Sequence, residues 1–135
     1  MIFPPPHMLF HEPMDDRAMT KLWSEYQVKY KTELDVFEID AAIVFSVEEF
    51  SRIFEIWITS KSSKRFKLLI VWHSHFLSIA CQQILRRWLE TKSYRCRVWF
   101  HVEYINNIQS AIMSRCITKQ IKHDIVVPEI YGKTN

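Results

Sequence analysis

The residues that most directly suggest chemistry are two histidines on alternate positions, His73 and His75. Alternate residues of a strand point to the same side, so both imidazoles could approach one metal ion. Cys81 follows about one helical turn beyond them and could add a sulfur ligand. No fourth ligand is evident, and the spacing matches no common zinc motif. We therefore favour hydrogen-bonded histidines in a cleft, and we expect neither a metal nor another cofactor.

Arginines supply a second kind of chemistry, because a guanidinium can bind phosphate oxygens. The adjacent pair Arg86 and Arg87 could contact a nucleic-acid backbone. A solvated helix face that pairs with Glu90 explains the same residues equally well. The basic segment 61–67 is better explained as a solvated turn than as a DNA contact.

The composition indicates a single folded domain without a glycine-rich phosphate loop. The chain has 135 residues, of which 48% are hydrophobic and 14% aromatic, enough for a substantial core. Its one glycine, Gly132, lies near the C-terminus. Because glycine lets the backbone approach phosphate groups closely, this composition excludes a working loop of that kind. The formal net charge of +3 is too small to argue for nucleic-acid binding by itself.

Cysteine content and the lack of long apolar runs favour an intracellular protein. Cys81, Cys96 and Cys116 are an odd number without CxxC spacing, which argues against a disulfide framework or a zinc knuckle. A reducing compartment, cytosol or nucleus, is therefore expected. No apolar run approaches the length of a membrane span, and residues 1–6 do not resemble a signal peptide.

Hydrophobic periodicity predicts strands that alternate with helices, which is typical of a parallel α/β sheet. Ser46 and Glu49 form a capping-box pattern at the start of the second helix. The expected strands are 8–10, 35–39, 67–71, 97–102 and 117–121, and the expected helices are 15–30, 46–58, 76–90 and 108–113. The third helix is expected to bury one apolar face, made of Leu77, Ala80, Cys81, Ile84, Leu85 and Trp88.

Two short motifs carry a resemblance to a known family. The first has the pattern Gln-x-x-Leu-Arg-Arg-x-x-Glu and runs from Gln82 to Glu90, and the second is Ser114-Arg115-Cys116. Together with the lead-in Pro6-His7-Met8-Leu9-Phe10, they resemble the small subunits of eukaryotic replication factor C, a clamp loader of the AAA+ class. The likeness is greatest to those subunits that are weak or silent as ATPases.

The resemblance implies a RecA-like AAA+ core of the α/β class. Its five parallel strands would follow the order 5-1-4-3-2, with helices on both faces. Residues 1–121 would form a degenerate clamp-loader-like domain and residues 122–135 a loose tail. The lid and collar domains of the family have no counterpart in the sequence.

The segment at the position of the family's phosphate loop departs from the family pattern. Ala18 stands at the lysine position, and Met19 stands at the position of the magnesium-binding hydroxyl. A phosphate loop works through backbone N–H groups and a lysine at a helix N-terminus. Glu12, Asp15 and Asp16 would instead place carboxylates there, where they would satisfy the helix dipole and repel a triphosphate.

The Walker B and sensor positions also depart from the family. Trp72 and His73 stand where the family has its Walker B Asp-Glu pair. His75 stands at the family's following acidic position, and Glu103 stands at the position of the sensor asparagine. Magnesium needs oxygen ligands, and tryptophan offers none. We therefore expect a degenerate nucleotide site and no ATPase activity.

Arg115 is the one catalytic-type residue that matches the family pattern. In the family, the arginine of the Ser114-Arg115-Cys116 motif reaches a neighbouring subunit's ATP site and stabilises the transferring phosphate. Alternatively, the motif is kept for packing, with Arg115 in a local salt bridge. The resemblance also places Arg86 and Arg87 on the helix that faces primed DNA.

Two functional classes follow from the resemblance. The first is a non-catalytic clamp-loader-like subunit, a pseudo-ATPase, that binds an AAA+ partner in DNA replication or repair. The second is a protein-interaction scaffold in a chromatin or telomere complex, which the missing collar favours. Both imply the nucleus, at most indirect contact with DNA, and no membrane. A third class, an enzyme that uses His73, His75 or Glu103, would need an ordered ligand that no spacing predicts.

Overall fold

Five parallel strands form the centre of the molecule in the computed structural model, which describes residues 3–43 and 46–122. The strands are β1 (Met8–His11), β2 (Leu34–Asp40), β3 (Phe66–Trp72), β4 (Cys96–Val102) and β5 (Ile117–Gln120). Their order across the sheet is β2-β3-β4-β1-β5, and every neighbouring pair is parallel. This is the order that the resemblance implied, so the expected RecA-like AAA+ architecture is confirmed.

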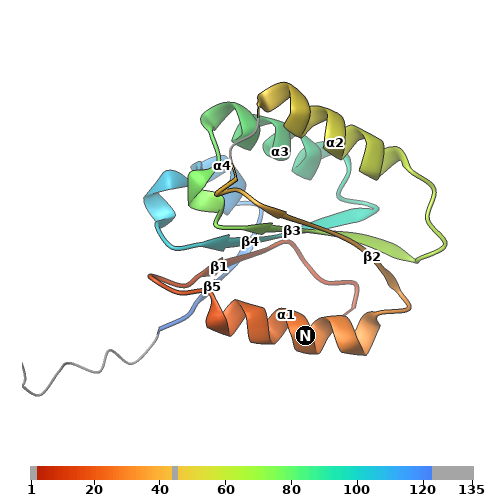
Figure 1. Ribbon diagram of the computed structural model, residues 1–135, viewed down its shortest axis with the longest axis horizontal. Helices are drawn as coiled ribbons and strands as arrows, with labels where there is room; N and C mark the ends of the chain where they lie inside the picture. Colours follow the sequence, from red (N-terminus) through yellow and green to blue (C-terminus); the bar gives the residue numbers. More distant parts are fainter. Residues whose placement is uncertain (1–2, 44–45, 123–135) are drawn as a thin grey trace, which may run out of the picture.

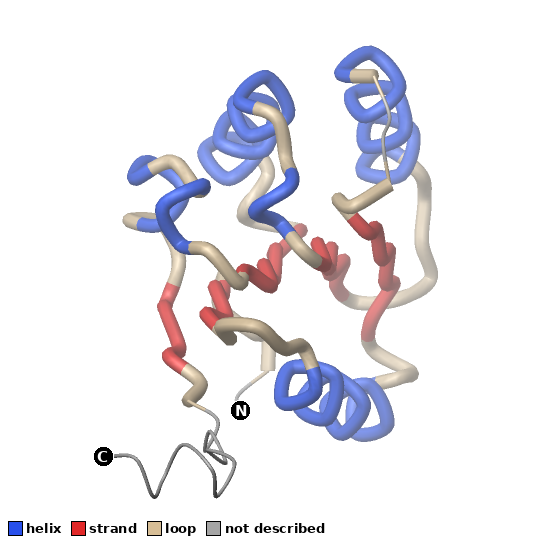
Figure 2. Tube along the Cα trace, turned by 60° about the vertical axis from the view of Figure 1, so that its left-hand side comes forward, coloured by secondary structure: helices blue, strands red, loops and turns tan. Residues whose placement is uncertain are grey.

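Helices cover both faces of this sheet (Figures 1 and 2). The helices are α1 (Arg17–Tyr30), α2 (Val47–Thr59), α3 (Ile79–Thr91) and α4 (Ser110–Met113), with the 3₁₀ turns η1 (Ser74–Phe76) and η2 (Ile105–Asn107). Helix α1 lies alone on one face, and α2, α3 and α4 lie on the other. Ser46 begins α2 as expected, because its Oγ accepts the Glu49 N–H at 3.1 Å.

The central strand β3 is buried on both faces, as its continuous apolar sequence predicted. Leu69 and Val71 pack in the core cluster beneath α2 and α3. Leu68 and Ile70 point the other way, into the cluster around α1 that includes Trp99. The two clusters hold the sheet between its helical layers, so the strand ends are fixed relative to one another.

The start of the third helix was predicted incorrectly, whereas its buried face was predicted correctly except for Ala80. Helix α3 begins at Ile79, because Ser78 Oγ accepts the Cys81 N–H at 3.1 Å and so caps the helix there. Phe76 and Leu77 lie before it, and Phe76 is 60% exposed. Ala80, expected inside, is exposed.

The periodicity missed two buried side chains on this helix, Leu89 and the polar Gln82. Its amide nitrogen donates to the carbonyls of Leu77 and Asn107, at 3.2 and 2.8 Å. Its oxygen accepts the Gln109 N–H at 2.8 Å. A polar group that is fully hydrogen-bonded in this way can lie inside the protein at little cost.

The last part of the described chain differs slightly from expectation. The short helix predicted at 108–113 is present as α4 but begins at Ser110, and η2 precedes it. The expected tail 122–135 lies outside the described residues, apart from Lys122. No helix within the described ranges has both the length and the apolar character needed to cross a membrane.

Candidate functional site

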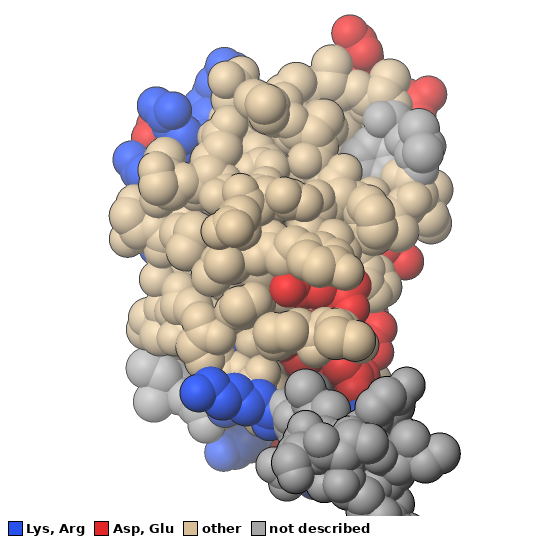
Figure 3. Space-filling model, turned by 90° about the vertical axis from the view of Figure 1, so that its left-hand side faces the viewer, with Lys and Arg blue, Asp and Glu red and all other residues tan. Residues whose placement is uncertain are grey.

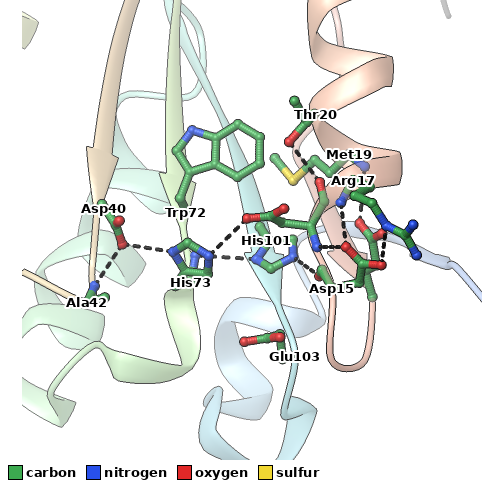
Figure 4. Close-up of polar contacts among 12 residues, drawn as sticks. Asp15, Arg17, Met19, Thr20, Asp40, Ala42, Trp72, His73, His101 and Glu103 are labelled. Atoms are coloured by element: carbon green, nitrogen blue, oxygen red, sulfur yellow. Dashed lines mark hydrogen bonds and ion pairs between the residues drawn. The ribbon is translucent and has the colours of Figure 1, made fainter.

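The sequence-predicted nucleotide-site residues meet where the central strands end. In an open parallel sheet, ligands commonly bind outside the carboxyl ends of the strands. The β1–α1 connection and the residues after β3 and β4 form this region (Figure 4). The residues brought there are Glu12, Asp15, Asp16, Ala18, Met19, Trp72, His73, His75 and Glu103.

The carboxylate of Glu12 accepts hydrogen bonds from the N-terminal turn of α1. The residue is fully buried, and its backbone N–H donates to the Val102 carbonyl at 2.9 Å, which fixes it beside β4. Its carboxylate accepts the N–H groups of Ala18 and Met19, at 2.9 and 3.1 Å. The first turn of a helix leaves such donors unsatisfied, and its dipole favours negative charge. In a phosphate loop the same position holds a phosphate group.

Asp15 adds a second carboxylate to this turn. Its Oδ1 accepts the N–H groups of Asp16 and Arg17, at 2.8 and 3.0 Å. The Arg17 guanidinium donates to Oδ2 at 2.6 Å. Mainly through the Arg17 backbone hydrogen bond, and further through its side chain, the pKa of Asp15 is lowered to about 2. Asp15 is therefore ionised at neutral pH.

His73 lies between two carboxylates from different elements. Its Nδ1 is 2.9 Å from Asp40 at the end of β2, and its Nε2 is 3.2 Å from Asp16 before α1. Partial burial acts to lower the pKa of His73, but the bonds and charges of Asp40 and Asp16 outweigh it and raise that pKa. Both ring nitrogens can donate only when the imidazole is protonated. The backbone of His73 is left-handed, with φ 53°, which is uncommon for a residue other than glycine.

His101 supports this arrangement from β4. It is fully buried, and its Nδ1 accepts the His73 backbone N–H at 3.3 Å. Nε2 therefore carries the proton, which it donates to the Asp15 carbonyl at 2.7 Å. Sequence reasoning missed both His101 and Asp40. The signal for His101 was a histidine inside an otherwise apolar strand end, and nothing marked Asp40 beyond its place after β2.

His75 and Glu103 form a separate pair after β3 and β4. His75 Nδ1 accepts the Glu103 N–H at 3.2 Å, so Nε2 carries its proton. Nε2 lies 3.2 Å from a Glu103 carboxylate oxygen, but the angle between them does not allow a hydrogen bond. Burial lowers the pKa of His75. The charge of Glu103 acts to raise that pKa, whereas His73 and His101 lower it further.

Most of the polar side chains at this end of the sheet thus form hydrogen bonds or ion pairs with other groups of the same site. Trp72 donates its indole N–H to Glu38 at 2.9 Å. Within the described ranges, no cluster of three or more His, Cys, Asp or Glu residues has a geometry suited to a metal ion. Cys81, the third ligand considered for such a site, lies in the core cluster with α2. The arrangement can hold charge and hydrogen bonds, but Ala18 and Met19 supply neither the lysine nor the hydroxyl of a phosphate loop, and the Thr20 hydroxyl donates to the Asp16 carbonyl at 2.8 Å.

The arginines that the sequence singled out, Arg86, Arg87 and Arg115, lie away from this site. The Arg115 guanidinium donates to Glu90 and to the Ala111 carbonyl, each at 2.7 Å. Arg86 approaches the same Glu90 oxygen at 3.5 Å, and Arg87 is exposed on α3. Arg115 precedes β5, so it lies at the opposite end of the sheet from Glu12.

Ser114 and Cys116 are the other two residues of the Arg115 motif. Ser114 Oγ donates to the Ala111 carbonyl at 3.2 Å. Burial raises the pKa of the Cys116 thiol to about 12, so this cysteine is not a reactive thiolate.

Comparison with known proteins gives structural matches only. No family model and no curated protein matches the sequence. A *Thermotoga maritima* RuvB, described as a Holliday junction branch migration motor, is similar with a TM-score of 0.63 and 16% identity. The match covers 86% of this chain and 37% of that one.

A second match is a DNA polymerase III gamma subunit-related protein from *Thermotoga maritima*. It has a TM-score of 0.67 and 14% identity, and covers 94% of this chain and 43% of that one. The chain therefore spans less than half the length of either neighbour. Both neighbours share the AAA+ fold, and at these identities the likeness shows the fold alone.

Proposed function

We propose that this chain, whose fold is that of AAA+ clamp loaders, is a non-catalytic assembly module that binds protein partners in DNA replication or repair. The proposal has two parts, the loss of ATP chemistry and the binding of a protein. Each rests on its own observation and has its own experiment.

The loss of ATP chemistry rests on the position of Glu12. Its carboxylate already accepts the two α1 N–H groups that a phosphate would need. A triphosphate would have to displace a buried side chain and lie beside Asp15 and Asp16, whose negative charges repel it. Ala18 and Met19 offer neither the ammonium nor the hydroxyl that phosphate and magnesium require.

The experiment for this part is a calorimetric titration with ATP and magnesium, paired with thermal unfolding. We expect no saturable heat and no change in Tm. A ligand at 100 times its Kd would raise the free energy of unfolding by about 2.7 kcal/mol, so a working site would be evident. Saturable binding by the wild-type chain would contradict this part of the proposal.

The binding of a protein rests on apolar side chains that are exposed at the carboxyl ends of the strands. They follow four of the strands in the chain and lie in loops, in η1 and at the first residue of α3. Figure 3 shows the face at this end of the sheet, which is largely uncharged around one acidic group. Exposed apolar groups gathered on one face mark interaction surfaces. The residues are Met14, Ile43, Phe76, Ile79 and Tyr104.

The experiment for this part is affinity purification of the tagged protein from its native cells, with mass spectrometry of what is recovered. The double variant Phe76→Ser with Tyr104→Ser is expected to lose the partner. Val28→Ser is the matched control, because Val28 is 79% exposed on α1, on the opposite face of the sheet. Equal recovery by both variants would show that this face is not the binding surface.

The identity of the recovered proteins separates the two functional classes. Recovery of an AAA+ subunit would favour a clamp-loader-like module, and Arg115→Ala should then slow that partner's ATP turnover. Arg52→Ala is the control, because Arg52 is an exposed arginine on α2 and lies outside the Ser-Arg-Cys motif. Recovery of chromatin or telomere proteins alone would favour the scaffold. A nuclear location, and backbone contacts of Arg86 and Arg87 with DNA, belong to this proposal as well.

A further inference from the structure

We propose that the outer edge of β2, with the apolar groove between β2 and α2, docks an extended segment of a partner protein that carries lysine or arginine beside apolar residues. This inference rests on the proposed function only in taking the chain to bind a protein. It adds where such a segment binds and what chemistry it has.

The outer edge of β2 presents backbone groups for pairing. β2 is the terminal strand on its side of the sheet, and no described strand pairs beyond it (Figures 1 and 2). The Glu33 carbonyl accepts from Phe66, and the Ala41 N–H donates to Trp72, both toward β3. Because successive residues of a strand alternate, Val36 and Glu38 direct their N–H and C=O groups outward.

This edge lacks several of the features that usually protect an edge strand. Proline, lysine and bulges discourage pairing with another chain. The seven residues of β2 read Leu-Asp-Val-Phe-Glu-Ile-Asp, and all seven pair in continuous register with β3. An added strand could therefore form a regular ladder on the outer side, the geometry by which many domains bind extended peptides.

A groove beside the edge can receive side chains from such a strand. Phe37 and Ile39 of β2 face α2, where Phe50, Ile53 and Phe54 complete a cavity of about 270 Å³. Ile53 is 38% exposed at this groove. Alternate residues of an added strand would point toward the groove, so one apolar side chain at every second position fits the surface.

The acidic residues on β2 indicate which kind of segment would bind at this edge. Asp35, Glu38 and Asp40 lie on this one strand, and among the described residues no lysine or arginine lines the groove. Asp35 is 4.0 Å from Lys67, and Asp40 contacts His73, whereas Glu38 accepts only the neutral Trp72 indole among the contacts described. Pairing of β2 with a second copy of β2 would bring carboxylates together, which is unfavourable. A basic segment would complement them.

The experiment uses three fluorescent peptides with the full chain: one alternating lysine with valine, the same peptide with a central proline, and one with glutamate in place of lysine. Only the first should bind by fluorescence anisotropy. On binding, the backbone N–H groups of Val36 and Glu38 should gain protection from hydrogen exchange, as measured by NMR.

Ile53→Arg should weaken this binding about tenfold or more, because it fills the groove and adds a like charge. Ile53→Ala should weaken it less, and Val28→Arg, on the opposite face, should not change it. Circular dichroism checks that each variant folds. Equal binding of the lysine and glutamate peptides, no effect of Ile53→Arg, or concentration-dependent self-association through β2 would each overturn the proposal.

The outcome is separable from the test of the proposed function. If a partner is recovered from cells but no peptide binds β2, only the docking site is wrong. If the lysine peptide binds and the cellular experiment recovers nothing, the docking site stands and the assembly role fails.

Discussion

The imidazole of His73 lies 2.9 Å from the carboxylate of Asp40, and this contact joins the ends of two neighbouring strands, β2 and β3. The second ring nitrogen reaches Asp16 at 3.2 Å, so one side chain connects the sheet with the start of α1. At this end of the sheet, Asp16 and Asp40 are thus held by contacts with a single histidine.

The contact gives a prediction about pH. The pKa of His73 is raised in the folded state, so the protonated ring stabilises the fold. This contribution is complete below about pH 6.5, the usual pKa of histidine, and is lost as the pH rises through the folded-state value. Urea unfolding from pH 5 to 8 should show that His73→Gln is more destabilising at the acidic end.

Other histidines act with the opposite sign, so the prediction concerns the difference between wild type and variant. Burial, with a smaller effect of Arg97, lowers the pKa of His7 to about 4. The stability that neutral His7 contributes is lost as the pH falls from about 6.5 toward 4. If the difference between wild type and His73→Gln did not change with pH, the role assigned to the protonated ring would be wrong.

A second prediction concerns Glu12. Glu12→Ala leaves the N–H groups of Ala18 and Met19 without their acceptor, and should lower the free energy of unfolding by about 1–3 kcal/mol. Added phosphate should recover part of this loss, since an anion can bind the vacated helix terminus. Chemical denaturation with and without phosphate measures both effects.

Glu12→Gln is the matched control for this prediction. It keeps one acceptor oxygen, so its loss of stability should be smaller and phosphate should help it less. Equal stabilisation of wild type and Glu12→Ala by phosphate would show that the anion binds elsewhere.

A third prediction concerns Gln82, whose side chain joins α3 to the loops around residues 77 and 107–109. Gln82→Ala removes three hydrogen bonds from a buried position and should cost about 2–3 kcal/mol of stability. Gln83→Ala, one residue along and exposed, should change stability little. Thermal unfolding of both variants tests this, and similar losses for the two would contradict the assigned role.

The sequence was most informative where a single physical signal acted alone. The apolar run of β3 and the Ser46 cap predicted their elements correctly, because burial and capping are local in the sequence. The strand order followed from the resemblance and not from periodicity. The start of α3 was misplaced because the apolar pattern extends to Phe76, while Ser78 sets the helix boundary.

The site was predictable only in part, because its contacts are tertiary. Asp15 could be placed near a helix terminus from its position in the chain, and Glu12 from the resemblance. Asp40 and His101 meet His73 only because β2, β3 and β4 are neighbours in the sheet. No spacing in the sequence encodes those distances.

Glu12 has one further consequence for how such a protein could be controlled. A ligand that is part of the same chain acts at an effective concentration set by its tether, which for a short connection is in the millimolar range or above. Under the proposed function, its occupancy would therefore not follow the supply of ATP in the cell. Under the proposed function, a helix terminus occupied in this way has no nucleotide-bound and nucleotide-free states, and control would come from the abundance of the protein or from its partners.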